Sequence, residues 1–146
     1  MDDGIEVVFS SDLRRAAETA QIAFGESGIP VLLDWRLREC DYGNLNGGPS
    51  DEHRHSRARF LDTPYPGGES WRQAIARVGG FLDDLPPRWE GGRVLIIGHI
   101  ATRWALDHYL RGVSLRTLVE GDFTWQEGWE YTMETTSIGR DSSMRD

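Results

Sequence analysis

The sequence contains very little cysteine and no lysine: Cys40 is the single cysteine among 146 residues, and all 16 basic residues are arginine. One cysteine excludes a disulfide within the chain and fits a reducing cytoplasm. No apolar run is long enough to span a membrane, and the N-terminus lacks the pattern of a signal peptide. We therefore expect a cytoplasmic protein that does not enter a membrane. We attribute the absence of lysine to a coding bias.

Positive charge is also scarce, because 24 acidic residues outweigh the 16 basic ones and leave a net charge of -8. Nucleic-acid binding requires a basic face, so this balance excludes broad binding to nucleic acid. It still allows a small anionic ligand bound by a few local arginines. The length and the apolar fraction of 38% fit one domain with one core. We expect this domain to cover residues 1–134, and the polar residues 135–146 to form a disordered tail.

The clearest structural signal is a strand followed directly by a helix, in residues 93–110. Four consecutive aliphatic residues, 94–97, predict a strand buried inside a parallel sheet. Apolar residues at three- and four-residue spacing then predict a helix. His99 stands between the two, at the carboxyl end of the strand and just before the helix N-terminus. Anionic ligands bind at such places in α/β proteins. The alternative is a structural histidine held by hydrogen bonds.

Other strands and helices alternate along the chain. A short strand at residues 5–9 is followed by a helix that starts from an N-cap at Ser11 or Asp12. Close packing against the sheet would compensate for Gly79 and Gly80, which cost about 1 kcal/mol each inside a helix. The alternation predicts an α/β three-layer sandwich, a mainly parallel sheet with helices on both faces. The remaining expected elements are an extended piece at 31–33, helices at 51–61, 69–85 and 114–119, loops at 36–50 and 63–68, and two strands within 122–133.

Three side chains have the chemistry of a phosphate site. Arg15, near the start of the first helix, offers planar donors with a permanent charge. Glu39, in the glycine-rich loop, is able to protonate a leaving oxygen if its carboxyl group is buried. His99 is able to attack phosphorus, move a proton or donate to a phosphoryl oxygen. Taken singly, Arg15 is better explained as a solvated helix residue and Glu39 as a surface charge of the loop.

Four segments in order carry a resemblance to a known family. They read FSSDLRRAAETAQ at 9–21, LRECDYGNLNGG at 37–48, PGGESW at 66–71 and VLIIGHIA at 94–101. Together they make the chain similar to the histidine phosphatase superfamily, also called the phosphoglycerate mutase-like family. The resemblance implies a phosphoglycerate mutase-like fold and a hydrolase that uses a phosphohistidine intermediate. It implies no metal and no cofactor, because arginines and histidines neutralise the phosphoryl charge.

The resemblance also implies roles for particular residues. Arg15 matches the family's phosphate-binding arginine, Glu39 its general acid, and His99 its second histidine, which holds the phosphoryl group. The expected partner is therefore a small phosphorylated substrate or phosphate. Glu69, Ser70 and Ile100 match positions beside the pocket, so we place them with Arg15 among the substrate-binding residues.

A metal site has little support in the sequence. His53 and His55 are two residues apart, so their imidazoles diverge on a helix. Together with Cys40 they fit no usual zinc spacing. The sequence also lacks a dinucleotide-binding Gly-x-Gly-x-x-Gly turn and a P-loop. We therefore expect neither a metal nor a nucleotide cofactor.

The chain departs from the family pattern in one respect: it has no Arg-His-Gly stretch, which carries the nucleophilic histidine in the family. Its first strand corresponds to the family's second strand, so we expect an N-terminally incomplete sheet with unpaired edges at Val7 and Val94. Three explanations stay open. In the first, Met1 lies inside a longer reading frame. In the second, the chain is a natural remnant that binds phosphorylated ligands. In the third, two chains pair their sheets as a homodimer.

Two functions follow from these alternatives. The first is hydrolysis of a small metabolite's phosphomonoester through phosphohistidine; in one variant His99 itself takes the phosphoryl group. The second is a non-catalytic phosphoryl-binding or assembly module. Mutase activity is less expected, because residues 44–66 are too short for the large insertion of the family's mutases. The sequence does not name the substrate.

Overall fold

The fold is built on three short parallel strands, seen in a computed structural model that describes residues 4–45, 57–85, 89, 91–121 and 128–133. The strands are β1 (Val7–Ser10), β2 (Val31–Leu33) and β3 (Val94–Ile97), in the order β2-β1-β3. The helices are α1 (Arg14–Phe24), α3 (Trp71–Asp84), α5 (Ile100–Arg111) and α6 (Leu115–Glu120). Three 3-10 turns complete the set: η1 (Trp35–Leu37), η2 (Gly43–Leu45) and η3 (Ala58–Phe60).

The register of the sheet brings the strand ends together. β1 pairs in parallel with both neighbours, so Ser10 lies opposite Leu33 on one side and Ile97 on the other. The residues that follow β1 and β3 therefore leave the sheet at the same edge. This geometry places the Ser11 region beside the turn that leads into α5.

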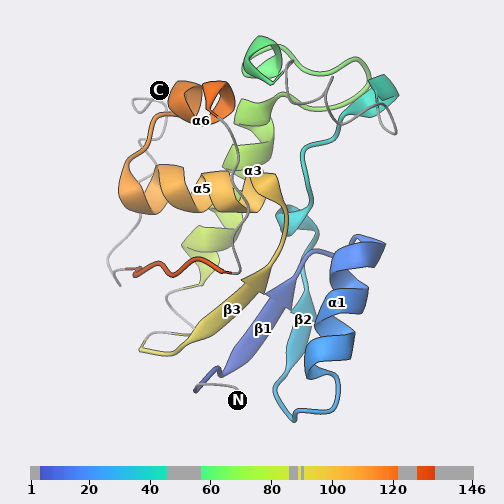
Figure 1. The fold of residues 1–146 in the computed structure, drawn as a ribbon, viewed down its shortest axis with the longest axis vertical. Helices are drawn as coiled ribbons and strands as arrows, with labels where there is room; N and C mark the ends of the chain where they lie inside the picture. Colours follow the sequence, from blue (N-terminus) through green and yellow to red (C-terminus); the bar gives the residue numbers. More distant parts are fainter. Residues whose placement is uncertain (1–3, 46–56, 86–88, 90, 122–127, 134–146) are drawn as a thin grey trace.

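Helices cover both faces of the sheet (Figure 1). α1 contacts β1 and β2 on one face. On the other face the ring of Phe9 meets the ring of Phe81 in α3 edge to face, with centroids 5.1 Å apart. α3 packs in turn against α5, where Trp71 and Trp104 have centroids 4.8 Å apart. The predicted α/β fold with helices on both faces is confirmed.

α3 is the best-defined helix of the chain. Its N-terminus has a capping box, in which the Ser70 hydroxyl accepts from the Gln73 amide and the Gln73 side chain accepts from the Ser70 amide. Gly79 is required for packing, because a Cβ there would lie 2.7 Å from the ring of Tyr109. The predicted partner of this close approach was the sheet, but the structure shows that it is α5.

Burial within the sheet differs from the prediction in two ways. All four residues of β3 are only half buried, because β3 pairs with β1 alone among the described residues. The prediction that β3 lies buried inside the sheet is therefore wrong. Val7, expected at an exposed edge, is completely buried, because β1 is the middle strand of the three.

The start of α1 also differs from the prediction. Leu13 is the N-cap and has no side-chain hydrogen bond to the helix, since its side chain has no acceptor. The Ser11 hydroxyl accepts from the Leu13 amide and so shapes the turn before the helix. Neither Ser11 nor Asp12 is therefore the N-cap.

Several expectations fall partly outside the described residues. Residues 51–56 of the expected helix lie outside them, and the rest of it holds only the short turn η3. The expected loop at 36–50 holds two 3-10 turns, η1 and η2. Residues 122–127 of the expected strand pair are not described, and 128–133 form no strand. The expected tail at 135–146 also lies outside. None of the helices in the described ranges has the length and apolar character needed to cross a bilayer.

Candidate functional site

His99 occupies the junction between β3 and α5, as its position in the sequence predicted. It is the N-cap residue of α5 and is half buried. Its Nε2 atom lies 3.0 Å from the Oγ atom of Ser11, which follows β1 on the neighbouring strand. The hydroxyl donates or accepts in this bond according to the tautomer of the ring. Two adjacent strand ends are thus joined side chain to side chain.

Glu39 reaches the same junction from the loop between η1 and η2. Its carboxylate accepts hydrogen bonds from the Ile100 amide at 3.2 Å and the Ala101 amide at 2.9 Å. The amide of Cys40 donates to it as well, at 3.0 Å. The sequence predicted an anionic ligand at the N-terminus of α5, but in the structure the carboxylate of Glu39 binds these amides.

Thr102 links the two predicted catalytic residues. Its hydroxyl donates to the carbonyl of Leu37 at 3.3 Å, in the segment that leads to Glu39. The same oxygen accepts from the amide of His99 at 3.2 Å. Thr102 lies in the first turn of α5 and is buried. It therefore couples the backbone near Glu39 to the backbone of His99.

The charges around His99 show which groups lie near it. Burial is the main cause that lowers the pKa of His99 below its ordinary value of 6.5. The Glu39 carboxylate opposes this change, while the positive charges of Arg15 and Arg77 reinforce it. The imidazole is therefore neutral near pH 7. Arg15 lies exposed in the first turn of α1, within electrostatic reach of the ring.

The other three predicted site residues contact protein groups. Ile100 offers its backbone amide to Glu39. Glu69 forms a two-pronged ion pair with Arg77, with distances of 2.7 and 2.9 Å. Ser70 is buried and caps α3. The structure thus brings Glu39 and His99 to one junction with Arg15 within electrostatic reach, whereas Glu69 and Ser70 bind other protein groups.

Sequence reasoning missed three residues of this site: Ser11, Arg77 and Thr102. Arg77 had a visible signal, because it lies three residues after Ala74 and four before Phe81, on the apolar stripe of α3. A charge on a buried stripe requires a partner. Ser11 and Thr102 had no comparable signal, since small hydroxyl residues are common at strand ends and in first helical turns.

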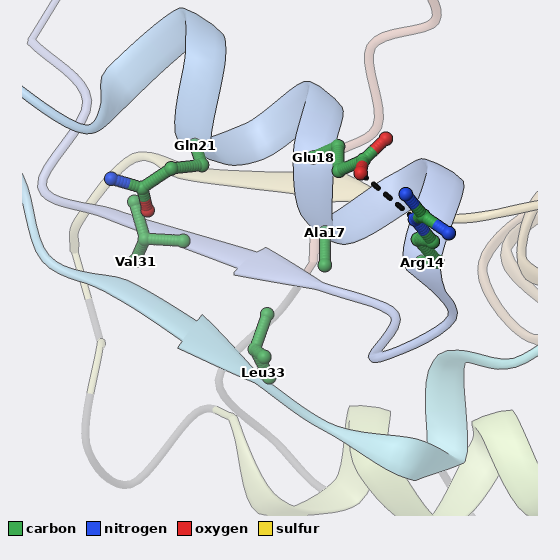
Figure 2. A pocket seen from close by; sticks show the side chains of 6 residues that line it. All are labelled: Arg14, Ala17, Glu18, Gln21, Val31 and Leu33. Carbon is green, nitrogen blue, oxygen red and sulfur yellow. Dashed lines mark hydrogen bonds and ion pairs between the residues drawn. The ribbon is translucent and has the colours of Figure 1, made fainter.

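A hollow elsewhere on the molecule does not include these residues. It lies between α1 and β2, and an ion pair between Arg14 and Glu18 crosses its rim (Figure 2). Its lining is Arg14, Ala17, Glu18, Gln21, Val31 and Leu33, so it contains none of the predicted site residues.

Metal ligands do not gather in the part of the chain that the structure describes: no group of three or more histidine, cysteine, aspartate or glutamate side chains is placed to hold an ion there. Cys40 is buried, and burial with the nearby Glu69 and Glu39 charges raises the pKa of its thiol well above the usual range. His53 and His55 lie outside the described residues.

The arrangement has the chemistry to hold a phosphoryl group. A permanently charged arginine and a neutral imidazole both donate hydrogen bonds to phosphoryl oxygens. A carboxyl group beside them is placed to exchange a proton with an ester oxygen. All three lie at the carboxyl edge of the sheet, where α/β proteins bind their ligands.

Comparison with known proteins supports this chemistry. The sequence model of the histidine phosphatase superfamily (branch 1) matches residues 1–128. A 2,3-bisphosphoglycerate-dependent phosphoglycerate mutase of Methylobacterium sp. (strain 4-46) is 35% identical over 126 residues, which cover 77% of this chain and 61% of that protein. The same enzyme of Allorhizobium ampelinum is 38% identical, over 81% of this chain and 57% of that protein. The chain thus spans about 60% of the length of these curated relatives.

Solved structures show the same fold. Bacillus stearothermophilus YhfR has a TM-score of 0.67 and 28% identity, covering 83% of this chain and 64% of its own. A mycobacterial glucosyl-3-phosphoglycerate phosphatase has a TM-score of 0.66, covering 80% of this chain and 62% of its own. Its identity is 24%, so it supports the fold alone.

Proposed function

Because this chain belongs to the histidine phosphatase superfamily (branch 1), as its sequence motifs predicted, we propose that its site binds the phosphoryl group of a small phosphorylated metabolite and serves in hydrolysis of the phosphomonoester. The curated relatives are named as phosphoglycerate mutases, whose reaction transfers a phosphoryl group. We propose hydrolysis instead of mutase activity because the segment 44–66 is too short to hold the large insertion of the family's mutases.

One observation carries the proposal: the carboxylate of Glu39 accepts hydrogen bonds from the amides of Ile100 and Ala101, directly after His99, and Arg15 lies within electrostatic reach of the same imidazole. The three residues come from separate parts of the sequence, in α1, in the loop after η1 and at the start of α5. Surface charges with no common role have no reason to gather at one half-buried ring. A phosphoryl group between Arg15 and His99 would receive donors from two sides.

In the proposed reaction, His99 is the histidine that takes the phosphoryl group: a nitrogen of its ring attacks phosphorus, and the bond from phosphorus to the ester oxygen breaks. The carboxyl group of Glu39 gives its proton to the leaving oxygen, which departs as an alcohol. Water then attacks phosphorus, the phosphorus–nitrogen bond breaks, and Glu39 takes a proton from that water. Inorganic phosphate leaves, and the enzyme returns to its starting state. Arg15 holds the phosphoryl oxygens throughout.

A second candidate function is binding of a phosphoryl ligand without turnover. This function is favoured because the described residues include two histidines, His99 and His108, and neither is free to act as a nucleophile. His108 is buried with its Nδ1 atom bonded to the Val113 carbonyl at 2.8 Å, so it is unsuited to attack a substrate. His99 is already bonded to Ser11. A homodimer that completes the site from a second chain is a further proposal.

A single experiment separates the two candidates. The full chain is incubated with p-nitrophenyl phosphate, with product release measured over time and phosphohistidine sought by acid-labile, base-stable labelling. Turnover that is lost in His99→Ala supports hydrolysis. Ligand binding without turnover or labelling supports the binding module. Neither binding nor turnover, or turnover that survives in His99→Ala, contradicts the role given to this site.

A further inference from the structure

Arg77, in α3, forms hydrogen bonds with one carboxylate and with three backbone carbonyls. Its side chain is only 10% exposed, and it faces the loop that carries Glu39. Two of its nitrogens bind the carboxylate of Glu69, at 2.9 and 2.7 Å. Planar contact with one carboxylate fixes the plane of the guanidinium group. The remaining donors are therefore held in a set direction.

These remaining donors bind backbone carbonyls around Glu39. Nη1 donates to the carbonyls of Arg36 and Arg38, at 3.0 and 2.9 Å. Nη2 donates to the carbonyl of Glu39 itself, at 3.2 Å. One guanidinium group thus holds three carbonyls within four consecutive residues. Beyond the short turn η1, this segment has no helix or strand hydrogen bonds of its own to fix its position.

Glu69 completes the arrangement on the other side of Glu39. Its Oε1 atom, which binds Arg77, also accepts from the amide of Asp41 at 3.0 Å. The backbone is therefore held before Glu39 by Arg77 and after it by Glu69. With the backbone held on both sides, the position of the Glu39 side chain is the one that these contacts determine. This side chain extends to the amides of Ile100 and Ala101.

We propose that Arg77 is a positioning residue for Glu39, with Glu69 as the partner that orients it. The pair fixes the loop so that the Glu39 carboxyl group stays at the N-terminus of α5, beside His99. The inference rests on the proposed function, because it takes Glu39 as the group that exchanges a proton with the substrate. Arg77 itself contacts no substrate in this role.

Lysine is unable to replace Arg77. Its single ammonium group has three donors and no planar fork, whereas Arg77 serves one carboxylate and three carbonyls at once. Arg77→Lys therefore keeps the charge and loses the geometry. A role that depends only on charge near His99 would survive this change, and a positioning role would not.

The first part of the test observes the position of Glu39 directly. In the full chain, the amide resonances of Ile100 and Ala101 report the two hydrogen bonds to the carboxylate. In Glu39→Ala they move to the values of unbonded amides. We expect Arg77→Lys and Arg77→Met to move them in the same direction. The matched control is Arg72→Met, in the same helix, because Arg72 forms an ion pair with Asp62. Unmoved resonances in both Arg77 variants would overturn the inference.

The second part uses turnover of p-nitrophenyl phosphate in a double-mutant cycle. We expect Arg77→Lys to lower kcat on the order of 10- to 100-fold with little change in KM, since Arg15 and His99 still bind the phosphoryl group. In a Glu39→Gln background the same change should cost nothing further. An equal loss in both backgrounds would mean that Arg77 only supports folding, which overturns the inference.

The two parts separate this inference from the proposed function. A chain without turnover, whose Ile100 and Ala101 amides still move in the Arg77 variants, contradicts the proposed hydrolysis and leaves the positioning intact. A chain with turnover whose amides do not move contradicts the positioning alone. A cooperative thermal unfolding transition is used to check that each variant is folded. If Arg77→Met does not fold, both measurements are made on Arg77→Lys alone.

Discussion

The Oγ atom of Ser11 lies 3.0 Å from Nε2 of His99, so the ends of two adjacent strands, β1 and β3, are joined through their side chains. Ser11 is completely buried, and its hydroxyl also accepts from the amide of Leu13 at the start of α1. The hydroxyl therefore fixes both the ring of His99 and the turn that presents Arg15. Both ends of the proposed phosphoryl site depend on this one oxygen.

Removing this oxygen should disturb His99 without disrupting the sheet. Ser11→Ala loses two hydrogen bonds, which costs about 1–2 kcal/mol of stability. We also expect a change in the ¹⁵N shift of His99 Nε2. Ser10→Ala is the matched control, because Ser10 is equally buried and its hydroxyl donates to the carbonyl of Ser11. An identical Nε2 shift in the two variants would show that the bond to Ser11 does not set the ring.

Stability should depend on the titration of His99. Its pKa in the folded chain is lowered from 6.5 mainly by burial, so between these two values the unfolded chain binds more protons. The free energy of unfolding should therefore fall as the pH decreases from 6.5 through the folded pKa. Above pH 6.5 this contribution is fully present.

Urea unfolding of the chain and of His99→Asn, near pH 7.5 and near pH 5, measures this contribution. We expect a smaller loss at low pH in the variant, because it has no imidazole to titrate at this position. The carboxyl groups of Asp12 and Asp34, whose pKa values are lowered below 3.8 through their hydrogen bonds and ion pairs, titrate in a lower range. Equal losses in the two proteins would contradict the burial of a neutral ring.

Gly79 and Gly80 offer a pair of opposite substitutions in α3. Gly79→Ala places a Cβ within 2.7–2.9 Å of the Tyr109 ring, and we expect a loss of roughly 1–3 kcal/mol. Gly80→Ala meets nothing within 4 Å, so helix propensity should add roughly 0.5–1 kcal/mol. Thermal or urea unfolding measures both. A Gly79→Ala chain as stable as Gly80→Ala would contradict the close packing of α3 on α5.

Cys40 should react slowly with alkylating reagents. Burial raises the pKa of its thiol, and the negative charges of Glu69 and Glu39 raise it further, so the reactive thiolate is scarce near neutral pH. We expect iodoacetamide to modify the folded chain far more slowly than the urea-unfolded chain, measured by mass spectrometry at matched pH. Equal rates in the two states would show that the Cys40 loop opens freely.

The elements with a strong local pattern were predictable from the sequence. α3 has an apolar stripe and a capping box, and β3 has four aliphatic residues in a row, so each was placed within a few residues. The burial of β3 was not predictable, because it depends on which strands lie beside it. The same reason explains why Val7 proved more buried than expected.

The site was predictable only in part. Arg15, Glu39 and His99 were selected because family motifs mark them, and their roles toward a substrate stay predictions. Their supports, Arg77 and Ser11, act through contacts between residues 38 and 88 positions apart in the sequence. No local pattern encodes such pairs. The roles of Glu69 and Ser70 toward a substrate stay predictions, as do the cytoplasmic location and the independence from metals.

The most direct test of the phosphoryl site is a titration of the full chain with inorganic phosphate, followed through the imidazole resonances of His99. Binding beside the ring should shift them in a saturable way and raise the pKa of His99, because a dianion favours the charged imidazole. Arg15→Gln should weaken the binding at least about tenfold, since it removes a charge-assisted donor. His108 serves as the internal control, because it is buried and bonded to Val113. An unshifted His99, or equal binding in Arg15→Gln, would contradict the presence of a phosphoryl site between these two residues.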